Sequence, residues 1–158
     1  MNKQQLTDLV IIPTLDEIPN GYSGEAVMAI QMIIAHESEG GEYIRQKDCC
    51  GDVGAFGATQ IEKLTHNQTW KFGDSIWKNA LNLKIISKTD FFLRKHPPVE
   101  RLIYDLRYAV FMTRQKLFMA QGALPLNAKD MSVYLKKHWN GDGKATPEKY
   151  HNDFLRWV

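Results

Sequence analysis

A carboxylate stands where an apolar helix is expected to end. In the segment AIQMIIAHESEGG, Glu37 takes the last place of an i, i+3, i+4, i+7 stripe whose other three positions are isoleucines. Gly40-Gly41 follows, and a glycine pair of this kind ends a helix. Apolar neighbours remove water from such a carboxylate, and the negative end of the helix dipole faces it, so both effects favour its protonated form. The pattern predicts a side chain suited to general acid catalysis.

The element that must position Glu37 is a helix over about residues 24–37, with Ser23 as its N-cap and Glu25 in its first turn. The glycine-rich stretch after it predicts a small hairpin or an irregular lobe. Apolar periodicity predicts further helices at about 3–17, 62–71, 74–86, 98–121, 129–138 and 146–157. The 98–121 segment has a broad apolar stripe, as expected of a central packing helix. We therefore expect a mainly α fold with one loop-rich insertion.

Length and composition indicate one compact domain. A chain of 158 residues with 44% hydrophobic residues can bury roughly 70% of its unfolded surface. No internal repeat or linker divides it, so we expect a single domain over residues 1–158. Residues 1–22 are expected to form an N-terminal extension packed on that domain.

Charge and apolar runs exclude several classes of function. The net charge is +2, and the chain has no concentrated basic run, so nucleic acid is not an expected partner. The first 25 residues contain only the short apolar run Leu9 to Ile12, which predicts neither a signal peptide nor a membrane span. Cys49 and Cys50 are adjacent, which favours two free thiols in a protein that matures in a reducing compartment.

Metal and phosphate chemistry have weak support in the sequence. The two cysteines could be combined with His36 and His66 into a zinc site, but adjacent cysteines are a poor tetrahedral pair, and no C-x₂-C spacing exists. The glycines of GDVGAFGA lack the strand-then-helix context of a phosphate loop. We expect no metal and no cofactor.

Three motifs occur in order along the chain: HES at residues 36–38, GAFGATQIE at 54–62 and HWNGDGKATPEKY at 138–150. Together they resemble the lysozyme-like superfamily, especially lytic transglycosylases and goose-type lysozymes. Thr65-His66 and Trp70, which follow QIE, are similar to phage-encoded members of that group. The resemblance implies a lysozyme-like fold, with a helical lobe beside a small loop-rich or short β-hairpin lobe.

The resemblance also implies a role for individual residues. Glu37 would protonate the glycosidic oxygen between N-acetylmuramic acid and N-acetylglucosamine. Gln60 can donate and accept hydrogen bonds from a sugar, and the glycines at 54 and 57 would let the backbone approach it. The implied substrate-binding residues are Ser38, Gly57, Thr59, Gln60, Glu62, Trp139, Asn140 and Tyr150.

The sequence departs from the family pattern at two places. Ala58-Thr59 replaces Leu-Met, and Trp139 stands where transglycosylases usually have tyrosine. A two-carboxylate glycosidase needs a second acid at roughly 5 to 9.5 Å from the first, and the candidates are Asp48, Asp52 and Glu62. If none is close, the acetamido group or the 6-hydroxyl of the substrate could take that role, with Glu37 acting first as acid and then as base. The single-acid version is slightly favoured.

The favoured hypothesis is a phage-encoded enzyme that cleaves bacterial peptidoglycan strands. Without an export signal it would be made in the host cytoplasm and reach the periplasm or cell wall from within a virion, in contact with other virion proteins, or through a separate membrane lesion. One alternative is a virion structural protein that keeps the fold with little or no catalysis, and another is a sugar-binding module. For Glu37 itself, the alternative to a catalytic role is a helix-terminal carboxylate that faces solvent or pairs with Arg45 or Lys47.

Overall fold

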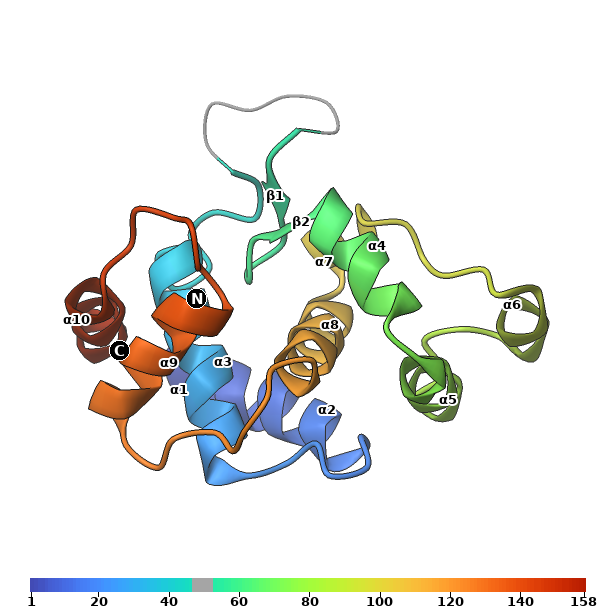
Figure 1. Cartoon of the computed structure of the whole chain (residues 1–158), viewed down its shortest axis with the longest axis horizontal. Helices are drawn as coiled ribbons and strands as arrows, with labels where there is room; N and C mark the ends of the chain where they lie inside the picture. Colours follow the sequence, from blue (N-terminus) through green and yellow to red (C-terminus); the bar gives the residue numbers. More distant parts are fainter. Residues whose placement is uncertain (47–52) are drawn as a thin grey trace.

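The computed structural model describes residues 1–46 and 53–158, and these residues form helices around one small antiparallel sheet (Figure 1). The protein is mainly α. In chain order the elements are α1 (Lys3–Leu6), the π-helical η1 (Thr7–Ile11), α2 (Ile12–Asp16), α3 (Gly24–Glu37), β1 (Ala55–Phe56), β2 (Ile61–Glu62), α4 (Lys63–Lys71), α5 (Asp74–Asn82), α6 (Lys88–Leu93), α7 (Arg101–Tyr104), α8 (Leu106–Phe118), α9 (Ala128–His138) and α10 (Pro147–Arg156).

Two helices, α3 and α8, make up the centre of the core. Helix α3 begins at Gly24 after the N-cap Ser23, whose hydroxyl accepts a hydrogen bond from the Ala26 amide, and it ends at Glu37, as its sequence predicts. Its isoleucine stripe is fully buried. Helix α8 is buried on nearly every side, which fits the central position expected of its segment.

The prediction of one long helix over 98–121 is wrong, because the structure divides this segment at Asp105 into α7 and α8. Asp105 has an extended backbone, and its carboxylate accepts a hydrogen bond from the Tyr108 amide at 2.9 Å, as an N-cap does. Helix α5 also ends earlier than predicted, and Lys84 then adopts a positive φ of 57°. Helix α6 was not predicted, although Ser87 and Asp90 form a capping box at its start.

The predicted hairpin is a two-stranded antiparallel sheet in which Ala55 pairs with Glu62 and Phe56 with Ile61. Gly57 begins its turn at a φ of +76°, and a Cβ there would lie 2.5 Å from the carbonyl oxygen of Leu102 in α7. The turn can therefore sit against α7 only with glycine at this position.

The N-terminal segment belongs to the same core as the rest of the chain. Leu6, Ile11, Leu15 and Ile18 are all buried in the cluster that also contains the apolar residues of α3 and α8. The two termini lie near each other (Figure 1), and the indole of Trp157 donates a hydrogen bond to the Met1 carbonyl at 2.8 Å.

Among the described residues, none of the helices has the length and apolar character needed to cross a bilayer. Cys49 and Cys50, on which the expectation of two free thiols rests, lie outside the described residues.

Candidate active site

A cleft of about 460 Å³ opens at the C-terminal end of α3. One wall comes from the hairpin and the start of α4, the other from the end of α9 and the loop after it, and α8 contributes one side chain. The lining residues are Glu37, Gln46, Ala55, Gln60, Ile61, Glu62, Thr65, Lys116, Trp139, Asn140, Gly141, Asp142 and Gly143. The end of the predicted acid helix, the hairpin and the late Trp-Asn-Gly motif thus meet at one cavity.

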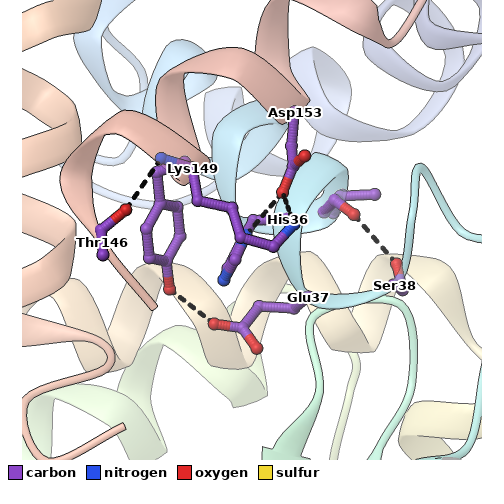
Figure 2. Close-up of polar contacts among 8 residues, drawn as sticks. His36, Glu37, Ser38, Thr146, Lys149 and Asp153 are labelled. Atoms are coloured by element: carbon purple, nitrogen blue, oxygen red, sulfur yellow. Dashed lines mark hydrogen bonds and ion pairs between the residues drawn. The ribbon is translucent and has the colours of Figure 1, made fainter. Parts of the chain in front are cut away.

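Glu37 is held by a buried phenol. The hydroxyl of Tyr150, in α10, donates a hydrogen bond to Oε1 of Glu37 at 2.5 Å, and the contact is drawn in Figure 2. Tyr150 is fully buried, and this burial together with the charge and hydrogen bond of Glu37 raises its pKa. The phenol therefore stays a donor at any physiological pH, and its bond is to Oε1 and not to Oε2.

A second polar group lies behind this pair. His36 precedes Glu37 on α3, and its Nδ1 lies 2.7 Å from Oδ2 of Asp153 in α10. Lys149 donates to the same oxygen at 2.9 Å (Figure 2). Burial alone would raise the pKa of Asp153, but the hydrogen bonds and charges of Lys149 and His36 lower it overall. The contacts join the end of α3 to α10.

Ser38 fixes the helix end to the hairpin. Its hydroxyl donates to the carbonyl of Ala58 at 2.6 Å and accepts from the amide of Gly41 at 3.0 Å. Because Ser38 follows the acid directly, these bonds restrain the backbone that carries Glu37. The side chain is fully buried, so Ser38 acts here through the protein rather than at the cleft surface.

Lys116 brings a positive charge into the cleft from α8. Its ammonium lies 3.7 Å from the ring centroid of Trp139 and donates to the carbonyl of that residue at 3.4 Å. Burial lowers the pKa of Lys116 to about 8, although the negative charges of Glu37 and Glu62 oppose this shift. Lys116 was not predicted from the sequence, because a lysine on a long amphipathic helix is usually expected to lie on the solvent-exposed face.

The cleft collects some of the residues that the sequence singled out. Gln60, Glu62, Trp139 and Asn140 line it together with Glu37. Gln60 also donates from its side chain to the Gly57 carbonyl at 2.7 Å. This set brings an amide, a carboxylate and an indole face into one cavity with the candidate acid.

The other singled-out residues lie behind the cleft surface. Ser38, Gly57, Thr59 and Tyr150 are buried and do not line the cavity. Gly57 gives close approach to α7, and the hydroxyl of Thr59 is enclosed with no hydrogen-bond partner among residues 1–46 and 53–158. Their place in the structure is to hold the acid and the hairpin.

Of the candidate second carboxylates, Glu62 lines the cleft, whereas Asp48 and Asp52 lie outside the described residues, as does Lys47. Asp142 adds a carboxylate on the opposite lip that sequence analysis did not name. Its signal was the turn sequence Asn-Gly-Asp-Gly, in which an aspartate is commonly a turn former.

No protein-family model, curated protein or solved structure matches the chain.

Proposed function

We propose that the protein is a lysozyme-like glycosidase that cleaves the β-1,4 bond between N-acetylmuramic acid and N-acetylglucosamine in bacterial peptidoglycan, with Glu37 as general acid. The observation that carries the proposal is the placement of one carboxylate, half-buried at the end of a buried helix and fixed by a buried phenol, in a cleft that also holds Gln60, Trp139 and Asn140. These are the side chains that the sequence motifs single out, and they come from segments far apart in the chain.

The geometry supports different roles for the two carboxylate oxygens of Glu37. Tyr150 occupies Oε1, so the proton for the glycosidic oxygen would be carried on Oε2, which is free of the phenol. After bond cleavage the carboxylate could take a proton back, from water or from the 6-hydroxyl of the sugar. The first course gives a hydrolysed product and the second an anhydro sugar.

The remaining cleft residues suit an N-acetylated sugar. The Gln60 side chain can bond hydroxyl or acetamido groups, and the indole of Trp139 offers an apolar ring face. Glu62 is the described candidate for a second carboxylate. The glycan strand of the cell wall is the proposed partner, and the protein would meet it in the periplasm, either as a phage virion component beside other virion proteins or after release through a membrane lesion.

The proposal is tested by digesting purified peptidoglycan with the wild-type protein and with Glu37→Gln, then weighing the released muropeptides by mass spectrometry. Release by the wild type and not by the variant is the expected result. Products one water lighter than hydrolysed muropeptides would assign a lytic transglycosylase, and hydrated products a lysozyme. Equal release by both proteins would overturn the role of Glu37.

A specific observation favours a second candidate, a virion structural protein with little or no catalysis. The ammonium of Lys116 has Glu37 and Glu62 as its charged neighbours, so these carboxylates have a role in balancing a buried charge that requires no catalysis. Absence of any released product from a folded wild-type protein, at every pH tried, would favour this candidate.

A further inference from the structure

The contact between α3 and α10 contains more than the bond between Glu37 and Tyr150. The His36 and Tyr150 rings pack against each other, with centroids 3.9 Å apart and planes tilted by 38°. The His36 imidazole therefore packs against the Tyr150 ring, whose hydroxyl bonds Glu37. Since His36 and Glu37 are consecutive, one end of α3 supplies both the acid and a surface that locates its partner.

The orientation of His36 is set from the other side. Nδ1 of its imidazole is 2.7 Å from Asp153, which lies one turn after Tyr150 on α10. The two side chains are only 9% and 15% exposed, so water competes little for this bond. Lys149, which is 61% exposed, completes the carboxylate's contacts from the solvent side. Figure 2 shows His36, Lys149 and Asp153 grouped together, above Glu37 in that view.

We propose that His36 and Asp153 are positioning residues for the acid: Asp153 orients the His36 ring, the ring holds Tyr150, and Tyr150 aims Glu37 into the cleft. The inference rests on the proposed function, which it deepens by assigning a role to two residues outside the cleft. Neither residue lines the cleft, so neither is expected to touch substrate.

The chain of contacts has a definite physical consequence. A hydroxyl that donates at 2.5 Å to Oε1 restricts rotation of the carboxylate, and a loosened ring would let that bond lengthen. Misplacement of a catalytic group by a small distance lowers the rate of the chemical step more than substrate binding. Asp153 should therefore affect kcat and leave KM nearly unchanged.

The test is a double-mutant cycle on peptidoglycan digestion with Asp153→Asn, Tyr150→Phe and the double variant. We expect Asp153→Asn to lower kcat about tenfold, equivalent to about 1.4 kcal/mol in activation free energy, with KM unchanged. Because Asp153 acts through Tyr150, adding Asp153→Asn to Tyr150→Phe should lower kcat no further. Multiplicative effects of the two substitutions would overturn the proposal, and so would an unchanged kcat in Asp153→Asn.

Thr146→Ala is the matched control, because Thr146 caps the same helix through the Lys149 amide at 3.2 Å and does not bond His36 or Asp153. It should destabilise α10 by roughly 1 kcal/mol with kcat unchanged. A loss of kcat equal to that of Asp153→Asn would mean that any loosening of α10 has this effect, and would overturn the specific role of the pair.

A spectroscopic readout separates this inference from the proposed function. With the tyrosines labelled by ¹³C at Cζ, the Tyr150 signal, assigned from its absence in Tyr150→Phe, should move in Asp153→Asn and in His36→Gln but not in Thr146→Ala. This holds whether or not the protein cleaves peptidoglycan. An inactive wild type would refute the proposed function alone, whereas an unmoved Tyr150 signal in both variants would refute the positioning role.

Discussion

At the scale of single residues, Lys116 is the group whose charge is most at odds with its surroundings. Its ammonium is removed from water on the central helix, and burial lowers its pKa from 10.5 to about 8. The favourable contact with the Trp139 ring offsets part of that penalty. Retention of a costly charge beside Glu37 and Glu62 is easier to explain by a role in the cleft than by stability.

Replacing Lys116 by methionine should raise stability at pH 7. The shift corresponds to about 3 kcal/mol of unfavourable burial, from which the lost cation–π contact removes about 1 kcal/mol, so we expect a gain of roughly 1–3 kcal/mol. Below pH 8 the ammonium is charged in the folded and unfolded states and the penalty is complete. From pH 8 to 10.5 the folded state releases the proton first, so wild-type stability should rise relative to Lys116→Met. Urea unfolding of both proteins from pH 7 to 10.5 measures this, and a less stable variant at pH 7 would contradict it.

His66 is a second buried titratable residue, and it belongs to a hydrogen-bonded network. The Trp70 indole donates to the Tyr108 hydroxyl at 3.1 Å, and that hydroxyl lies 2.7 Å from Nε2 of His66. With the Tyr108 hydroxyl donating to Nε2, the imidazole is neutral, and its Nδ1–H can donate to Asn67 at 3.1 Å. The network connects α4 to the central helix. Its hydrogen bonds are all made between polar groups of the protein itself.

Acid should therefore weaken the fold through His66. Burial lowers the pKa of His66 to about 4 from 6.5, with the positive charge of His96 adding to the effect, while Asn67 and Glu100 act in the opposite sense. The unfolded chain binds the proton first as pH falls below 6.5, so stability should fall from pH 6.5 to about 4, by up to about 3 kcal/mol. The slope of unfolding free energy against pH should be steeper for the wild type than for His66→Gln. Parallel curves for the two proteins over that range would show that His66 is not the cause.

At the scale of elements, the hairpin can pack closely against α7 because Gly57 has no side chain. Alanine there meets both a positive φ and the Leu102 carbonyl at 2.5 Å. Gly122 is the matched control, because it also has a positive φ, of 91°, but a Cβ would meet nothing within 4 Å. The two glycines separate backbone strain from steric contact.

Gly57→Ala should therefore lower the unfolding free energy by about 2–4 kcal/mol, the sum of about 1 kcal/mol for the left-handed backbone and about 1–3 kcal/mol for the overlap. Gly122→Ala should lower it by about 1 kcal/mol only. Chemical denaturation of both variants gives the comparison. Equal losses would mean that the turn can move away from α7 at no cost.

Elements with strong local signals could be predicted from the sequence, and α3 is the best case. A serine cap, a continuous apolar stripe and a glycine pair all indicate the same bounds. The break at Asp105 could not be read from periodicity, since the apolar stripe continues through it while a single carboxylate caps the new helix. Helix α6 has only six residues, and its apolar residues are consecutive in the sequence KTDFFL, so no helical period was present there for a prediction to use.

The residues of the candidate site could be predicted where they belong to one of the three sequence motifs. Gln60, Trp139 and Asn140 were singled out by type and order, and they line one cleft with Glu37. Tyr150 was named for contact with substrate, whereas its hydroxyl bonds the acid. Lys116 and Asp153 carry no motif, and only the packing of α8 and α10 against α3 brings them near Glu37.

At the scale of the whole molecule, the N-terminal segment is part of the fold that supports the cleft. Leu15 of α2 is 0% exposed in the core shared with α3 and α8, whereas Leu9, in the adjoining η1, is 73% exposed. If the segment were an added arm, loss of its core contacts would loosen that arm and leave the rest of the protein intact. If it is integral, the same loss must lower the stability of the whole chain.

The pair Leu15→Ala and Leu9→Ala distinguishes these two cases. Truncation of a fully buried leucine costs about 2–5 kcal/mol, and truncation of an exposed one changes stability by about 0.5 kcal/mol or less. In a Trp157→Phe background, which removes the indole bonded to Met1, we expect Leu15→Ala to shift the urea midpoint of both circular dichroism and tryptophan fluorescence by the same amount, because Trp70 and Trp77 pack together on α4 and α5, outside the N-terminal segment. A fluorescence transition left at the wild-type midpoint while part of the helical signal is lost earlier would mean that the segment unfolds separately. In that case residues 1–22 would be an extension that the cleft does not need, and shortened chains should keep the contact between Glu37 and Tyr150.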